Sequence, residues 1–166
     1  MHLGIFRRMT DWLRWALLPA ACVHIFEEFV FPGGFPVWYR AYRPDPSRIT
    51  PRFLIIVNVA LVIVCVNVGL VGHDPVGIPF WLVISALLCA NGCWHAWAGY
   101  KTRAYSPGVI TGLMIYVPLA VFGYLKVLES GAASVWTALV AFAVGASYQV
   151  WDAVYLNRGV RRVRNT

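Results

Sequence analysis

Charged residues are scarce in this chain of 166 residues: Asp, Glu, Lys and Arg make up only 13% of it, and only seven residues are acidic. Hydrophobic residues make up 60%, and the mean hydropathy is +0.65. Soluble domains contain roughly 25% charged residues, and a domain of this size could not bury so many apolar side chains. The composition therefore excludes an ordinary soluble domain and favours a membrane protein.

The chain also lacks low-complexity tracts, internal repeats and the cysteine spacing of metal fingers. Its four cysteines, Cys22, Cys65, Cys89 and Cys93, all lie in apolar runs, where free cysteine packs as a small hydrophobic residue. The net charge of +7 comes from short basic segments between apolar runs, with no interleaved basic patch, so no nucleic-acid partner is expected. One transmembrane domain over residues 1–166 is the expected organisation.

Five apolar runs are each long enough to cross a bilayer, which takes about 20 residues as a helix. Because lipid offers backbone groups no other partner, each run is expected to be α-helical. The sequence thus predicts an all-α, polytopic membrane helix bundle with about five transmembrane helices. These span about 12–31, 53–72, 80–99, 108–128 and 134–157, with a turn at 73–79 and a basic tail at 158–166.

The distribution of Lys and Arg predicts the orientation. With five spans, the regions after the first, third and fifth helices share one side, and they contain ten basic residues against four on the other side. The positive-inside rule then places the N-terminus outside and the C-terminus in the cytoplasm, as expected for a multi-pass protein of the cell (inner) membrane. The loop at 32–48 mixes Pro, Gly, aromatic residues and Arg, which is typical of a segment along the lipid headgroups that could cover a site.

The polar residues within the helices gather in one leaflet. Odd-numbered helices end on the cytoplasmic side and even-numbered ones begin there, so sequence position gives depth. At 1.5 Å of rise per residue, these residues lie roughly 5–12 Å inside the cytoplasmic boundary. Ionisable groups within a membrane usually have a function, so the convergence predicts a polar chamber. The residues are His24, Glu27, Glu28, Asn58, Asn91, His95, Gln149 and Asp152, with Tyr148 one helical turn from Asp152.

Structural roles remain open for several of these side chains. His24 could be a core histidine, and His95 could bond a neighbouring carbonyl. One of the two adjacent glutamates could pair with Arg40 or Arg43. Two carboxylates inside an apolar run nevertheless cost a few kcal/mol each, which favours a use for at least one of them.

Similar alternatives apply to the remaining polar residues. Asp152 lies near the basic tail and could pair with Arg158 or Arg161. Asn58 and Asn91 could join neighbouring helices by hydrogen bonds.

Three short signatures occur in order along the chain: His24-Ile-Phe-Glu27-Glu28, a second histidine at His95, and Tyr105-Ser-Pro-Gly108. In these the chain resembles the HXXEE family of integral membrane proteins, over roughly residues 10–130. The activity of that family is not established, so the resemblance implies that these residues matter without naming a reaction. Locally, the last signature predicts a turn into the fourth helix, with Tyr105 near the mouth of the chamber.

The favoured hypothesis is a metal site. A histidine and a carboxylate at helical spacing, met by His95 from another helix, suit zinc or iron with an open coordination position. The candidate ligands are His24, Glu27, Glu28 and His95, with one glutamate as a ligand and the other as the general base. The protein would then be an enzyme that performs hydrolytic or oxidative chemistry on a small lipophilic substrate, with the same four residues as its catalytic set.

Two other hypotheses remain. Without a metal, the Glu pair could serve as the acid of an isomerase or cyclase, with Trp94 and Trp97 stabilising a carbocation. Alternatively, the polar residues could belong to a small proton-coupled transporter or channel.

Membrane lipid is the expected surroundings, and the spacing Gly108-x-x-x-Gly112 gives a weak signal for a homo-oligomer. The residues expected to bind substrate are Asn58, Asn91, Trp94, Tyr105, Tyr148 and Asp152.

Overall fold

The computed structural model describes residues 2–71 and 76–164, and the side chains of residues 12–71 and 76–163. Part of the expected turn at 73–79 lies outside the described residues. Within the described part, the regular structure is entirely helical, which confirms the predicted all-α class. The elements are α1 (His2–Phe29), α2 (Phe35–Ala41), η1 (Pro46–Arg48), α3 (Pro51–Val71), α4 (Gly77–Thr102), α5 (Val109–Thr111), η2 (Gly112–Tyr116), α6 (Val117–Glu129) and α7 (Val135–Arg164).

Four of the described helices are long and apolar enough to cross a membrane: α3, α4, α7 and the continuous helix Val109–Glu129 formed by α5, η2 and α6. The chain is therefore a multi-pass membrane protein. α1 is also long, with 28 residues, but its described part includes Arg14, His24, Glu27 and Glu28 and is less apolar. The count of five spans and the orientation remain predictions.

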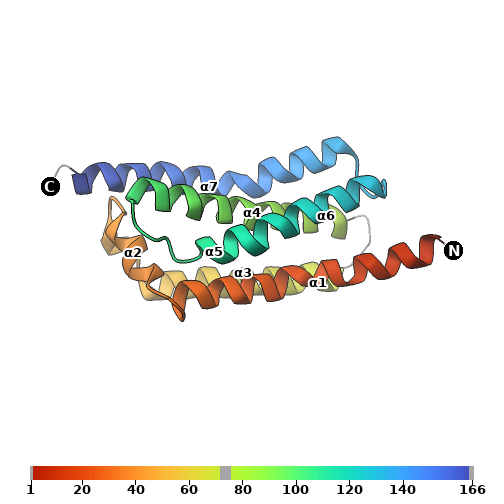
Figure 1. The fold of residues 1–166 in the computed structure, drawn as a ribbon, viewed down its shortest axis with the longest axis horizontal. Coiled ribbons are helices and arrows are strands. Elements are labelled where there is room, and N and C mark those ends of the chain that lie inside the picture. The colour runs from red at the N-terminus through yellow and green to blue at the C-terminus, as the bar shows by residue number, and fades with distance from the viewer. Residues whose placement is uncertain (1, 72–75, 165–166) are drawn as a thin grey trace.

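The long helices run side by side along the long axis of the molecule (Figure 1). α4 packs along α7, α1 packs along α3, and the helix formed by α5, η2 and α6 packs on α4. The short helix α2 lies at the end of the bundle where α1 and α7 end (Figure 1). The loop expected at 32–48 therefore contains a helix that covers this end.

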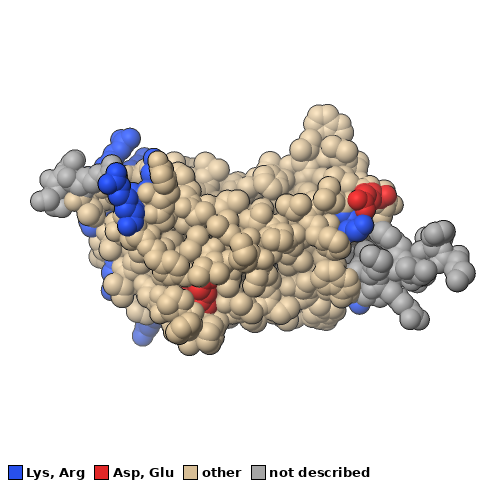
Figure 2. Space-filling model, viewed as in Figure 1, with Lys and Arg blue, Asp and Glu red and all other residues tan. Residues whose placement is uncertain are grey.

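Apolar side chains cover the outside of the bundle as well as fill its interior. Figure 2 shows a broad surface with few charged groups: Lys and Arg gather toward the ends, and one small acidic patch lies between them. Helices that are apolar all round are typical of a bundle in lipid. Because lipid is as apolar as the interior, close packing and satisfied polar groups hold such helices together, more than apolar burial does.

Two helix boundaries differ from the prediction. α1 begins at His2 rather than near residue 12, and α7 continues to Arg164, so the expected basic tail is helical as far as the structure describes it. Arginine favours helices, and Val160 on this extension is buried in a cluster with Leu156, near the end of the predicted helix, and with residues of α2. Packing against α2 thus extends α7 past the apolar run that the sequence marks.

Two glycines allow α4 and the helix after α5 to touch backbone to backbone. A Cβ on Gly92 would lie 2.6 Å from the Gly112 carbonyl oxygen, and a Cβ on Gly112 would lie 2.6 Å from Gly92 Cα. The second glycine of the expected dimer signal therefore packs within its own chain. This contact sets the spacing of the helices that hold His95 and Thr111, one turn or less away.

Gly92→Ala is expected to destabilise the protein by about 1–3 kcal/mol, because the added methyl group meets backbone that can move only if the helices separate. Gly99→Ala on the same helix is the matched control, since its nearest atom, the Ala104 carbonyl oxygen, is 3.3 Å away. Thermal unfolding in detergent, followed by circular dichroism, measures both. Equal melting temperatures for the two variants would contradict this account of the helix contact.

Candidate metal site and adjoining cavity

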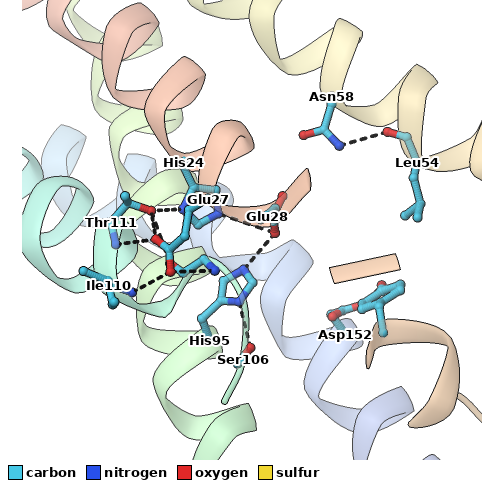
Figure 3. Close-up of polar contacts among 12 residues, drawn as sticks. His24, Glu27, Glu28, Leu54, Asn58, His95, Ser106, Ile110, Thr111 and Asp152 are labelled. Carbon is cyan, nitrogen blue, oxygen red and sulfur yellow. Dashed lines mark hydrogen bonds and ion pairs between the residues drawn. The ribbon is translucent and has the colours of Figure 1, made fainter. Parts of the chain in front are cut away.

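Three buried side chains from two helices meet in the half of the bundle near α2. His24 and Glu28 lie one turn apart on α1, and His95 projects from α4 (Figure 3). Glu28 Oε1 lies 3.6 Å from His24 Nε2 and 3.2 Å from His95 Nε2, and one ligand-type atom of each residue lies within 4.8 Å of the other two. Each residue is at most 5% exposed. These residues form a candidate metal site.

A hydroxyl group forms a hydrogen bond with the Nδ1 atom of each imidazole. His24 Nδ1 lies 2.9 Å from Thr111 Oγ1, and His95 Nδ1 lies 2.9 Å from Ser106 Oγ. The two Nε2 atoms are buried without a hydrogen-bond partner. Metal-binding histidines are typically oriented in this way, with one ring nitrogen bonded to a neighbour and the other directed at the metal.

The loop before α5 lies directly against both imidazoles because Gly108 has no side chain. Its φ of +102° is in the left-handed region that favours glycine. A Cβ there would lie 2.8 Å from His24 Cε1 and 2.9 Å from His95 Cε1. Any other residue at this position would be strained and would push the two rings apart.

Glu27 points away from the histidines toward the start of α5. It accepts hydrogen bonds from the backbone N–H groups of Gly108 (2.9 Å), Ile110 (3.1 Å) and Thr111 (2.7 Å). The hydroxyls of Tyr105 and Thr111 also donate to it, each at 2.5 Å. The first N–H groups of a helix have no partner within it and form its positive end. This carboxylate gives those groups an acceptor and places a negative charge at that end.

Tyr105 takes part in this arrangement as a neutral donor. Burial, together with the hydrogen bond to Glu27, raises the pKa of the Tyr105 phenol. The phenol therefore keeps its proton and anchors the loop to the carboxylate.

A cavity of about 410 Å³ adjoins the metal site, and α1, α2, α3, α4 and α7 bound it. His24 and Glu28 form part of its wall, and the second carboxylate oxygen of Glu28 points away from the histidines (Figure 3). The volume lies within the range of small-molecule sites, about 300–1,000 Å³. Most of the wall is apolar. Its other polar residues include Tyr39, Asn58, Asn91, Tyr148, Gln149 and Asp152.

Asp152 pairs with Arg43, which follows α2, and not with Arg158 or Arg161 of the tail. Arg43 Nη2 donates to both carboxylate oxygens, at 2.5 and 2.6 Å, and the Tyr39 hydroxyl donates to Oδ1 at 2.7 Å. The Arg43 guanidinium also stacks on the Tyr39 ring, 3.7 Å from its centroid. Burial, and then the Asp152 charge, raise the pKa of Tyr39. This pairing ties the segment that covers the cavity to α7.

The structure brings together most of the residues that the sequence singles out. Glu27 is the exception among the expected ligands, because its carboxylate binds the loop. Tyr105 is the exception among the residues expected to bind substrate, because it does not line the cavity and its hydroxyl donates to Glu27. Asn58 donates to the Leu54 carbonyl of its own helix, so this bond does not join two helices. The expected substrate-binding residues on the cavity wall are Asn58, Asn91, Trp94, Tyr148 and Asp152.

Four residues of the site were not among the predicted ones: Ser106, Thr111, Arg43 and Tyr39. Ser106 lies inside the Tyr105–Gly108 signature, and its hydroxyl between a tyrosine and a proline was an available signal. An aspartate within an apolar helix requires a partner, which pointed to an arginine but not to which one. The sequence contains no comparable signal for the role of Thr111.

Residues 15–123 match a family model described as "Protein of unknown function with HXXEE motif". The match includes every residue of the candidate metal site and the loop beside it, and it confirms the resemblance seen in the sequence. No curated protein and no solved structure matches the chain.

The two adjacent glutamates are expected to respond in opposite ways to the same substitution. Glu27→Gln should destabilise the protein by about 2 kcal/mol or more, because its amide N–H group would face N–H and O–H donors. Glu28→Gln should melt at or above the wild-type temperature in metal-free buffer, since it removes a buried charge that faces only imidazoles. Thermal unfolding with a chelator present compares them. Equal losses in the two variants would show that the glutamates do not have separate roles.

Proposed function

Since the chain belongs to the HXXEE family, whose function is unknown, its activity has to be argued from its own residues, and we propose that it is a metal-dependent membrane enzyme acting on a small lipophilic substrate. His24, Glu28 and His95 hold the metal, and the adjoining cavity receives the substrate. Glu27 positions the loop and is neither a ligand nor the general base.

The proton arrangement around His24 is the observation on which this proposal rests. A hydroxyl has a single proton to donate, and Thr111 Oγ1 lies closest to Glu27 Oε2, at 2.5 Å. Thr111 must then accept from His24 Nδ1, 2.9 Å away. In a neutral His24 the Nε2 lone pair is therefore directed toward Glu28 Oε1, another lone-pair atom, at 3.6 Å. A cation between the two relieves that repulsion.

The distances also support a metal. Ligand atoms about 2.0–2.1 Å from a tetrahedral zinc ion lie roughly 3.3 Å from one another. The two distances from Glu28 Oε1 to the imidazole nitrogens, 3.2 and 3.6 Å, are close to this value. Two histidines and one carboxylate suit zinc, and they also suit ferrous iron in enzymes that use oxygen.

A bound metal would supply Lewis-acid or redox chemistry at a position open to the cavity. His24 and Glu28 reach both the metal and the cavity wall, so a substrate there would meet the open coordination position. The second Glu28 oxygen, directed away from the histidines, is the carboxylate oxygen in the site best placed to hold a proton. Hydrolytic and oxidative reactions are both compatible with this arrangement.

The alternative hypotheses have less support. An acid formed by two carboxylates sharing a proton needs them to face each other, whereas Glu27 faces the start of α5 and Glu28 faces His95. A transporter needs polar groups along the whole path. Among the described residues, the buried Asp, Glu, His and Arg side chains lie in the half of the bundle near α2.

The same end of the bundle is proposed to face the cytoplasm, in the inner cell membrane. Basic residues after α1, at the end of α4 and in the last turns of α7 gather there, as the positive-inside rule requires. The polar half of the cavity then lies in the cytoplasmic leaflet, with lipid around the bundle.

The first test is elemental analysis of the protein purified in detergent without chelators. Wild type is expected to contain near-stoichiometric zinc or iron, and His24→Ala, Glu28→Gln and His95→Ala to lose it. His2 precedes His24 by 22 residues on α1 and gives a matched control, His2→Ala, which should keep the metal. Folded wild-type protein that neither retains nor takes up zinc or ferrous iron would refute the proposed metal site.

Removing the hydroxyls that bond the Nδ1 atoms of the two imidazoles should weaken metal binding without removing a ligand. Ser106→Ala and Thr111→Val are each expected to lower metal affinity roughly 10–100-fold, the usual effect of losing the partner of a metal-bound histidine. Ser147→Ala, at an exposed serine that bonds only its own helix, is the control. Competition against a chromogenic chelator measures the affinities. Unchanged affinity in both variants would mean that the hydroxyls do not orient metal ligands.

A further inference from the structure

The cavity beside the metal site opens sideways, between two helices that span the membrane. The lining residues with the largest exposed fractions are on α3 and α7: Phe53 is 42% exposed, Val57 40% and Tyr148 49%. The lining residues from α1 and α2 are all buried. α3 packs mainly on α1, whereas α7 packs on α4, so these two helices border the opening from opposite sides.

This opening faces the hydrocarbon region. Phe53 and Val57 lie within the apolar span Pro51–Val71, and Tyr148 lies within the span Val135–Val163. α2 covers the end of the cavity with Phe35 and Tyr39, and the Arg43–Asp152 ion pair fastens that cover. A ligand would therefore enter from lipid rather than from water.

The polar groups of the wall define which headgroup fits. No Lys or Arg lines the cavity in the described part of the chain, and the negative charge of Asp152 is neutralised by Arg43. A phosphate or sulfate would have no Lys or Arg side chain to bind; a cationic headgroup would find Asp152 paired with Arg43 and, under the proposed function, Glu28 bound to the metal. The headgroup that suits this wall is uncharged.

A buried hydrogen-bond donor without a partner indicates which kind of uncharged headgroup the cavity would bind. Trp94 lines the cavity, is 5% exposed, and its indole Nε1 has no hydrogen-bond partner. An indole N–H can only donate, and a buried unpaired donor is costly, so its natural partner is an acceptor oxygen on the ligand. The Nδ2 groups of Asn58 and Asn91 on the same wall can also donate to such an oxygen, while the unpaired Oδ1 of Asn91 would accept from the N–H of an amide headgroup.

The remainder of the wall suits a hydrocarbon chain. Along α3 the lining continues from Phe53 to Val64, about 16 Å at 1.5 Å per residue. Ile84, Leu87 and Leu88 face it from α4. An apolar slot of this length beside a small polar end has the shape of an amphiphile.

We infer that the substrate is a neutral single-chain lipid with a carbonyl headgroup, such as an ester or amide, which enters from the bilayer between α3 and α7. This inference rests on the proposed function, because the headgroup lies where the metal would be. The carbonyl oxygen meets Trp94 and the metal end of the cavity, and the chain lies along α3.

Photolabelling in phosphatidylcholine nanodiscs tests the inference. Three probes share one diazirine-bearing alkyl chain and differ in the headgroup: a methyl ester, a phosphate monoester and a trimethylammonium. The ester is expected to label peptides of α3 and α7 lining the cavity, and excess non-photoreactive ester should prevent the labelling. The two charged probes should give only labelling that no competitor prevents. Val57→Trp should lower the competable labelling roughly tenfold by filling the opening.

Neighbouring substitutions provide the controls. Ile56 is 66% exposed and does not line the cavity, so Ile56→Trp should label as wild type does. Trp94→Phe should weaken ester labelling and leave labelling by a plain alkyl probe unchanged, which a merely structural role of the indole would not produce.

The outcomes separate the two proposals because metal content is measured in the same preparations. Competable labelling by the phosphate or ammonium probe at least equal to that by the ester would overturn the choice of headgroup. Equal losses in Val57→Trp and Ile56→Trp would overturn the lateral entry. Metal-replete protein without competable ester labelling would refute the inference and leave the metal site standing. Competable ester labelling of protein that binds no metal would refute the proposed function alone.

Discussion

Two adjacent carboxylates within an apolar helix are the constraint on which the rest of this structure depends. A buried charge is tolerated only with partners, and neighbouring residues on one helix point in directions about 100° apart. Glu27 and Glu28 therefore need different partners from different elements. Glu27 takes five hydrogen bonds from the residues at the start of α5, and Glu28 takes two imidazoles. The bundle is arranged so that both sets reach the end of α1.

One loop contacts both the partners of Glu27 and the two imidazoles that face Glu28. Residues 105–108 give Glu27 a phenol and a backbone N–H, give His95 a hydroxyl, and lie against both rings without a side chain at Gly108. Thr111 bonds Glu27 and His24 with the same oxygen. A change at Glu27 would therefore reach the proposed metal site through the loop, although Glu27 is not one of the proposed ligands. Glu27, the first glutamate of the family signature, anchors this loop, and Gly108 lets the loop lie against both rings.

The sequence predicts which residues lie near this site, but not the different roles of Glu27 and Glu28. Apolar length alone gives the membrane class, and helix parity places His24, Glu28 and His95 at one depth. The sequence does not predict that Glu27 turns to the start of another helix, because every residue except proline has a backbone N–H donor and no residue type identifies those that bind. The partner of Asp152 is likewise decided by the fold, since Arg43 comes within reach only because α2 folds back over the cavity. The helical C-terminal extension depends on that same packing.

The position of the polar cluster in one half of the bundle agrees with the chemistry of an amphiphile. A lipid in a bilayer already has its headgroup near the interface and its chain toward the middle. It would therefore have to reorient little to enter a cavity with the same polarity gradient. The proposed metal ligands lie near the end of α1 and on α4, and the apolar wall of α3 continues away from them toward the centre of its span. α2 and the Arg43–Asp152 pair separate the polar end from water, while the side toward lipid stays open. Excluding water on one side and admitting lipid on the other would strengthen electrostatic interactions at the ligands and select the substrate by the medium it comes from.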